Sequence, residues 1–414
     1  MTPTNLFIFI VAALGRVSVN LIGDLYITEI ILLFTIFYLG KGFSWLLKSR
    51  TFNMLMIFAG LWLLNQMITD VYRATPLLDW TRGWAKIIFL IIDFTGVALL
   101  TRFRMDRIVI FFSGIGFSLL LQYLFFPNEA QVGGEFGDGA WKFGVGAFFN
   151  MIAAVFCATK LSRRLMGPVG GYLPLIVVSL IDLALNNRSS FGLSMAAAAF
   201  GMFKQWINHS PRLRERLTLL HFVCILVGGM VLSQGIIAIY TTAAINNWLG
   251  DAAREKYEMQ TTGDIGLFQG GRMESAASLQ AIQDSPILGH GSWPKDVYYI
   301  QVMVDTLTAR GAHFSESIYE GDPLIPTHSH ALGSWVEAGV FGGLFWTIAL
   351  ILAIISLFET LKREDTPASF VAAILFGYAW ACLFSAFSNS GRISAAGTLC
   401  LIASLISIKK QSGR

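Results

Sequence analysis

Long apolar segments separated by short polar connectors dominate this chain, and they decide what it can fold into. An α-helix crosses a roughly 30 Å hydrocarbon core with about 20 residues, and about twelve segments approach that length. Hydrocarbon offers no partners to backbone N–H and C=O groups, which favours helices. Only 14% of the 414 residues are charged, against roughly 25% in soluble domains. We therefore predict an all-α integral membrane protein.

The predicted spans form one membrane domain that is interrupted by one long loop. Nine spans fall within residues 1–240, the loop covers residues 241–327, and three spans fall within residues 328–414. The spans are predicted at residues 5–22, 26–46, 53–69, 83–101, 107–126, 141–159, 169–186, 190–207, 217–240, 330–358, 368–387 and 393–408.

Charge predicts which side each connector faces. Alternate connectors and the C-terminal tail together hold 17 of the 30 Lys and Arg residues, whereas the long loop holds 5 basic and 11 acidic residues. Short loops rich in Lys and Arg stay in the cytoplasm. We therefore predict that both termini are cytoplasmic and that the long loop is external.

The long loop contains segments that resemble structured elements. Residues 272–284 have helical spacing of apolar side chains, residues 285–293 form a turn rich in Pro and Gly, and residues 297–307 fit a second helix. A loop of this length is usually functional or disordered, and its aromatic residues argue against disorder. We expect short helices that cover the outer face.

Motifs in this loop and in the next span resemble a known family. Gly271-Arg272 precedes the first loop helix, Asp284-Ser285-Pro286-Ile287-Leu288-Gly289-His290-Gly291 follows it, and His328, Leu332, Glu337 and Gly339 come later. This order resembles the O-antigen ligase and polymerase superfamily, with its Gly-Arg start, its D-x-P-x-x-G-x-G turn and its His-Asn-x-x-Leu…Glu-x-Gly entry to a span. Ser329 replaces the usual Asn, and whether His328 or His330 is the family histidine stays open.

The resemblance implies a glycosyltransferase with a GT-C-like fold in the bacterial inner membrane. Its donor would be a glycan on undecaprenyl pyrophosphate, and its site would be periplasmic. An O-antigen ligase would use a sugar of the lipid A core as acceptor, and this is the favoured interpretation. A polymerase would use another repeat unit instead. The implied reaction inverts the anomeric carbon and needs no metal or cofactor, and no nucleic acid partner is expected.

Three side chains are predicted to carry the chemistry. Arg188 lies between the seventh and eighth spans, Arg272 opens the first loop helix, and His328 precedes the tenth span. A guanidinium binds a diphosphate through two parallel charge-assisted hydrogen bonds, and an imidazole can accept the proton of an acceptor hydroxyl. The alternatives are a headgroup contact for Arg188, a surface salt bridge for Arg272 and a helix cap for His328.

Five further residues are predicted to bind substrate: His330, Glu337, Arg82, Lys86 and His290. His330 could instead join His290 in a metal site, but no acidic ligand has a recognisable spacing, so no metal is predicted. Asp93 and Asp182 fall within predicted spans, where a carboxylate is a functional candidate by default.

A transporter is the competing class of protein. Transporters often carry inverted repeats and polar groups near the middle of the membrane. This sequence shows no internal repeat, and its polar residues cluster toward the predicted outer rim. Both observations favour an enzyme.

Overall fold

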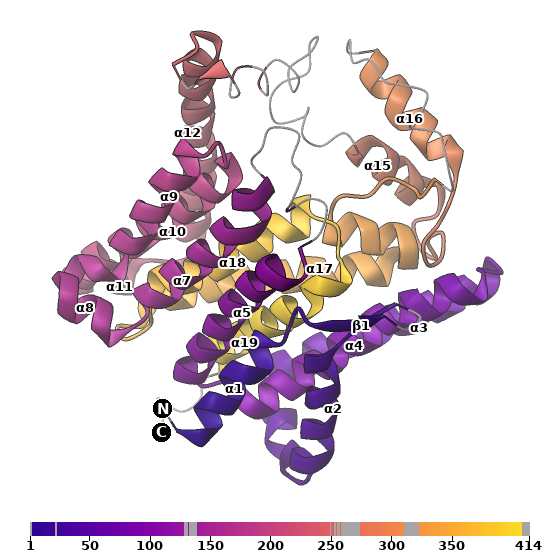
Figure 1. Ribbon diagram of the computed structural model, residues 1–414, viewed down its shortest axis with the longest axis horizontal. Helices are drawn as coiled ribbons and strands as arrows, with labels where there is room; N and C mark the ends of the chain where they lie inside the picture. The colour runs from indigo at the N-terminus through magenta and orange to yellow at the C-terminus, as the bar shows by residue number, and fades with distance from the viewer. Residues whose placement is uncertain are drawn as a thin grey trace.

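The computed structural model is mostly helical (Figure 1). It describes residues 2–20, 23–127, 131, 139–248, 250–251, 254, 257, 274–309 and 323–407. The α-helices are α1 (Pro3–Ala13), α2 (Ile27–Leu39), α3 (Arg50–Tyr72), α4 (Leu77–Thr101), α5 (Met105–Phe125), α7 (Gly146–Cys157), α8 (Lys160–Met166), α9 (Leu173–Ala184), α10 (Arg188–Asn208), α11 (Pro211–Arg216), α12 (Leu219–Ile245), α15 (Ser275–Asp284), α16 (Val297–Thr308), α17 (His330–Lys362), α18 (Ala368–Phe384) and α19 (Arg392–Ser407).

Shorter elements connect these helices. Strands β1 (Ser18–Asn20) and β2 (Asp24–Tyr26) pair antiparallel, with Val19 opposite Leu25. The 3₁₀ helices are η1 (Gly40–Lys48), η3 (Gly167–Gly171) and η5 (Asn389–Gly391), and η2 (Ala140–Val145) is a π-helix.

Several helices can cross a membrane, in agreement with the predicted class. Among the described residues, five are long and apolar enough, namely α3, α4, α5, the combined η2–α7 segment and α17. The segment Lys160–Gly171 and helix α9 pass the same test together, although they are bent by 70°. Other predicted spans coincide with shorter helices, such as α1 with 11 residues and α2 with 13. Twelve spans and a GT-C-like arrangement therefore stay predictions.

The predicted first span, residues 5–22, is shorter in the structure than expected. Helix α1 ends at Ala13, and the chain then turns into the β1–β2 hairpin. A charged residue, Arg16, follows the end of the helix, and its Nη1 donates to Gln122 Oε1 on α5 at 3.1 Å. A charged side chain held by a neighbouring helix costs less than one in an uninterrupted apolar span.

Helix α17 lies in the middle of the bundle, packed against α3, α18 and α19 (Figure 1).

Glycines let other helices of the bundle approach closely, because there is no side chain to hold the backbones apart. A Cβ atom added at the following glycines would collide with a neighbouring helix: Gly96 with Leu32, Gly114 with Phe9, Gly201 with Ser369 and Gly397 with Phe111.

Two of the connectors rich in basic residues meet at one end of the bundle. Arg214 of α11 forms an ion pair with Glu364, which follows α17. Nearby, Lys204 Nζ of α10 donates to the carbonyl of Thr366 at 2.8 Å. This grouping agrees with the predicted alternation of connectors along the chain. The membrane side that this end faces stays a prediction.

Helix α17 is interrupted at Ala338 and Gly339. Ala338 has φ −118° and ψ 17°, and Gly339 has φ 60° and ψ −154°. The second conformation is in practice open only to glycine, because a Cβ would clash with the backbone. The break separates a short segment, residues 330–337, from the long apolar segment, residues 340–362. It lies at the end of the bundle away from Glu364.

Candidate functional site

The turn formed by residues 285–293 fills the break in α17. The amides of His290 and Gly291 donate to the carbonyls of Val336 and Glu337 at 2.7 and 2.9 Å. A helix break would otherwise leave these carbonyls without partners, at a cost in free energy. The loop motif of the sequence analysis therefore packs against the break in α17 and supplies hydrogen-bond donors to its carbonyls.

Two glycines allow this close contact. Gly289 has φ +84° and Gly291 has φ +91°, a region that side chains with a Cβ rarely adopt. A Cβ on Gly289 would lie 2.5 Å from the backbone nitrogen of Gly339, and one on Gly291 would lie 2.6 Å from Thr75 Oγ1. The G-x-G spacing thus has a structural reason in this chain.

One face of α3 holds the other side of the turn. Asn65, Thr69 and Arg73 donate in order to the carbonyls of residues 287, 288 and 289. Arg73 Nη2 also donates to Ser285 Oγ at 2.9 Å. The turn is therefore clamped between α3 and α17 by hydrogen bonds from both helices.

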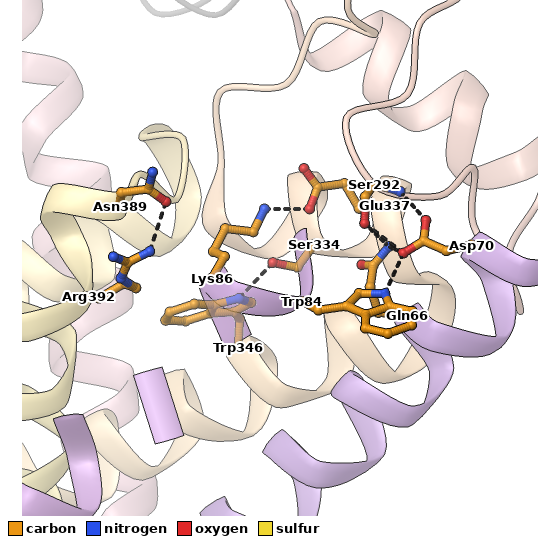
Figure 2. Close-up of polar contacts among 10 residues, drawn as sticks. All are labelled: Gln66, Asp70, Trp84, Lys86, Ser292, Ser334, Glu337, Trp346, Asn389 and Arg392. Carbon is orange, nitrogen blue, oxygen red and sulfur yellow. Dashed lines mark hydrogen bonds and ion pairs between the residues drawn. The ribbon is translucent and has the colours of Figure 1, made fainter. Parts of the chain in front are cut away.

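Asp70 completes this clamp (Figure 2). Its carboxylate accepts hydrogen bonds from the amide of Ser292 at 2.6 Å, from Ser292 Oγ at 2.7 Å, from Trp84 Nε1 at 2.8 Å and from Gln66 Nε2 at 3.3 Å. Only 2% of Asp70 is exposed, and a buried carboxylate needs such donors. Asp70 thereby joins α3, α4 and the loop.

Sequence reasoning missed this polar face of α3. A signal was nevertheless present: Asn65, Gln66, Thr69, Asp70 and Arg73 recur three to four residues apart near the end of an apolar helix. Residues at this spacing share one helix face. A polar face on a membrane helix indicates a polar partner, and here the partner is the turn.

Lys86 and Glu337 are brought together at the break, although 251 residues separate them in the sequence. Lys86 Nζ of α4 lies 2.5 Å from Glu337 Oε2, and the two side chains are 10% and 18% exposed. Figure 2 shows the two groups pointing toward each other beside the turn. Within the described part of the chain Glu337 is the one hydrogen-bond partner of the Lys86 ammonium, which can therefore donate further hydrogen bonds to a ligand.

His328 and His330 lie at the start of α17 but in different surroundings. Between them Ser329 caps the helix, and its hydroxyl donates to the carbonyl of Cys382 on α18 at 2.7 Å. The side chain of His328 is exposed. It is therefore open to a substrate at the end of the bundle.

His330 is buried, and its ring orientation is defined. Its Nδ1 lies 2.6 Å from the carbonyl oxygen of Ser385. A carbonyl only accepts, so Nδ1 carries the hydrogen and Nε2 carries the lone pair. The ring packs against Trp346 and Phe387, with centroids 4.9 and 5.1 Å away. His330 is held rigidly behind the exposed His328.

Helices α10 and α18 run antiparallel, which locates Arg188. Gly201 of α10 contacts Ser369 of α18, and three residues further along α10 the ammonium of Lys204 reaches the carbonyl of Thr366. Residue numbers therefore rise along α10 in the direction in which they fall toward the start of α18, as expected for antiparallel helices.

This register puts Arg188 at the level of the end of α18. Arg188 precedes Gly201 by 13 residues, and Cys382 follows Ser369 by 13 residues. With about 1.5 Å of rise per residue in both helices, Arg188 reaches the level of Cys382. The carbonyl of Cys382 accepts the hydrogen bond from Ser329. The first turn of α10 and the start of α17 therefore lie at the same end of α18, against which both helices pack.

A buried aspartate holds the turn that precedes α10. Asp182 of α9 accepts hydrogen bonds from Trp141 Nε1 at 2.8 Å, from Asn150 Nδ2 at 2.9 Å and from Asn187 Nδ2 at 3.4 Å. None of Asp182 is exposed. Because Asn187 directly precedes Arg188, this network defines where the first turn of α10 begins.

Arg82 and His290, two of the predicted substrate-binding residues, contact the scaffold. The Arg82 guanidinium lies 6.0 Å from the ring centroid of Trp293. His290 Nε2 donates to the carbonyl of Ala281 at 2.8 Å, and its ring packs edge-on against Tyr299. Burial lowers the pKa of His290, which favours the neutral ring. His290 thereby links α15, α16 and the turn.

Arg272 lies outside the described residues, so its distance from the other groups stays unknown. Among the residues that the structure describes, no three His, Cys, Asp or Glu side chains are grouped so as to hold a metal ion. The predicted helix over residues 272–284 coincides with α15 from Ser275 onward, and the one over residues 297–307 coincides with α16.

Neither a protein-family model nor a curated protein matches this chain. Its function is therefore inferred from its own residues.

Proposed function

We propose that this protein is a membrane glycosyltransferase of the O-antigen ligase type. It moves a glycan from undecaprenyl pyrophosphate to a sugar of the lipid A core, at the periplasmic face of the bacterial inner membrane, with inversion and without a metal. The observation that supports the proposal is that Arg188, at the start of α10, and the exposed His328, just before α17, lie at the same end of the bundle.

The donor binds through its diphosphate. Arg188 stands in the first turn of α10, where the guanidinium and the free amides of the helix start both favour an anion. Arg272 supplies a second cation in this proposal. Positive charge at this position stabilises the diphosphate as the bond to the anomeric carbon breaks, which is where stabilisation accelerates the reaction.

The acceptor is activated by His328. The imidazole takes the proton of the acceptor hydroxyl, the hydroxyl oxygen bonds to the anomeric carbon, and the diphosphate leaves with the bonding electron pair. General base assistance of this kind contributes about 10²- to 10⁴-fold. The exposure of the His328 side chain supports this role, and the buried His330 lies behind it as the alternative base.

Lys86 and Glu337 bind the acceptor in this proposal. Their ion pair lies at the break in α17 and keeps some exposure. The Lys86 ammonium can donate to a phosphate or a sugar hydroxyl, and the Glu337 carboxylate can accept from sugar hydroxyls. Arg82 and His290 lie at the same turn, and in this proposal they also contact substrate.

The test is transfer by purified protein. Carrier-linked glycan and lipid A core are mixed with the protein in detergent, and the product is detected as a gel shift. We expect His328→Ala to lose about 10²- to 10⁴-fold in rate, with unchanged thermal unfolding. The matched control is His209→Ala, since His209 is exposed near the opposite end of α10. Wild-type rates for His328→Ala would refute the assignment of the base.

The same assay separates the competing functions. Carrier-linked repeat units without lipid A core should give no product with a ligase and a ladder of products with a polymerase. A transporter would give no covalent product in either mixture, and would instead move carrier-linked glycan across proteoliposome membranes.

A further inference from the structure

Asp93 differs from the other buried aspartates of this protein. It lies in the middle of α4, and none of its surface is exposed. Neither carboxyl oxygen has a hydrogen-bond partner among the described residues. In contrast, Asp70 accepts from Ser292, Trp84 and Gln66, so burial alone does not explain the isolation of Asp93.

The nearest charges are already paired with each other. Arg392 of α19 forms an ion pair with Glu29 of α2 at 2.6 Å, and the two side chains are 3% and 1% exposed. Arg392 Nε donates to Glu29 Oε1, Nη1 donates to Asn389 Oδ1 at 2.9 Å, and Nη2 also donates to the carbonyl of Asp24 at 3.1 Å. Arg392 therefore has its partners and leaves no net positive charge for Asp93.

Charge from the surrounding helices does not reach Asp93 either. Lys86, on the same helix, pairs with Glu337. The charged residues of the other neighbouring helices stand near the helix ends, in contrast to the central Asp93: Arg50 and Asp70 on α3, Asp106 and Arg107 on α5, and Lys48 on η1. An ionised Asp93 would thus be an uncompensated charge within the bundle, which is far more costly than a neutral acid.

We propose that Asp93 is a proton-binding site, and that its side chain is a neutral carboxylic acid in the folded protein at neutral pH. The site is separate from the proposed glycan site and does not depend on it. Loss of the proton would place a second carboxylate near Arg392, in competition with Glu29. Since Arg392 also holds Asn389 of η5, proton binding at Asp93 helps to keep that connector in place.

The first test is infrared spectroscopy of purified protein at pH 7, with variants compared as difference spectra. We expect the carbonyl stretch of an undissociated carboxylic acid in the wild type and its loss in Asp93→Asn. Asp182→Asn is the matched control. Asp182 is equally buried but accepts from Trp141 and Asn150, so the band should persist in that variant. Absence of the band from the wild type, or its survival in Asp93→Asn, would overturn the proposal.

A second test uses the wild type alone and does not depend on how the variants fold. An apolar carbodiimide reacts with protonated carboxyl groups in membranes. The acid proton moves to one nitrogen, and the carboxyl oxygen bonds to the central carbon. The adduct then rearranges to a stable N-acylurea, and no group leaves. Mass spectrometry should find the adduct on Asp93 and none on Asp182. An adduct on Asp182 alone, or on neither residue, would count against the proposal.

Discussion

In the Lys86–Glu337 pair, each charged group is stabilised mainly by the other, because both side chains are largely shielded from water. Removing one partner from a buried ion pair leaves an uncompensated charge, whereas removing both leaves none. Exposed pairs behave differently because water compensates each charge. The protein contains both kinds, which allows a direct comparison.

We predict that Lys86→Met and Glu337→Gln each lower the free energy of unfolding by about 3 kcal/mol. The double variant should lose less than the sum of the two. Unfolding in detergent, followed by circular dichroism, provides the measurement. The control is Arg104→Met, since Arg104 pairs with Asp106 while both side chains are more than half exposed; it should cost less than about 1 kcal/mol. Additive losses in the double variant would contradict a coupled pair.

The histidine of the turn should make stability depend on pH. Burial holds the pKa of His290 in the folded protein below its usual value, which is about 6.5 in the unfolded chain. Protons therefore bind the unfolded state more readily. His290 should leave stability unchanged above about pH 6.5 and lower it as the pH falls below that value.

Thermal unfolding between pH 8 and pH 5 tests this prediction. We expect His290→Gln to unfold at a temperature that falls less with acidification than in the wild type, because its amide can still donate to Ala281 without binding a proton. His209→Gln, at an exposed position, should retain the wild-type profile. Identical profiles for His290→Gln and the wild type would exclude this role for His290.

At the scale of elements, the break in α17 and the turn of residues 285–293 form one unit. The amides of the turn donate hydrogen bonds to carbonyls of α17, and the break lets the backbone of the turn pack directly against that of the helix. Glycine at positions 289 and 339 makes both conformations possible. A side chain at either position should therefore damage two segments that are far apart in the sequence.

We predict that backbone strain makes Gly289→Ala and Gly339→Ala each lower the free energy of unfolding by about 1–3 kcal/mol. Steric contact with the partner backbone adds to this. Gly60→Ala on α3 is the control, because a Cβ there has nothing within 4 Å. It should be neutral or stabilise by up to about 1 kcal/mol. Thermal unfolding separates these outcomes, and an unaffected Gly339→Ala would mean that the break can close.

Local patterns predicted some of these elements and missed others. Helices α15 and α16 follow from their apolar spacing, and the turn between them follows from its Pro and Gly residues. The break in α17 was not predicted, because Gly339 stands in an apolar run that reads as continuous. Its conformation is explained only by the turn that contacts it, and such a contact leaves no periodic signal in the sequence.

At the scale of the whole molecule, groups from distant connectors gather at the two ends of the bundle. Arg214, Glu364, Lys204 and Thr366 meet at one end. The turn, the break in α17 and the start of α10 belong to the other. The sequence predicts that the connectors at the first end are cytoplasmic, and this stays a prediction.

Cysteine labelling in intact cells tests which end is outside. In a background with the four cysteines replaced by alanine, Gln283→Cys on α15 and Arg212→Cys on α11 occupy exposed positions. We expect a membrane-impermeant maleimide to label the first in intact cells and the second only after permeabilisation, because basic connectors stay inside. The reverse pattern would invert the predicted topology and move the proposed site to the cytoplasm.

The candidate site was predictable in its parts but not in its arrangement. His328 and Glu337 were selected because they match the motif of the family that the sequence resembles, and Lys86 was selected by its charge and predicted side of the membrane. That Lys86 meets Glu337, and that Asp182 holds the turn before Arg188, depends on how distant helices pack. A single sequence does not record such pairings, because each residue alone fits many neighbours.

The clamped turn also limits how the long loop can be exchanged. A loop grafted from another protein would have to supply amides to the carbonyls of Val336 and Glu337 and carbonyls to the donors on α3. Chimeras that swap residues 241–327 alone should therefore fail to assemble, whereas those that also carry α3 and the start of α17 should succeed. The turn and its two supporting helices are then expected to change together whenever one of them changes.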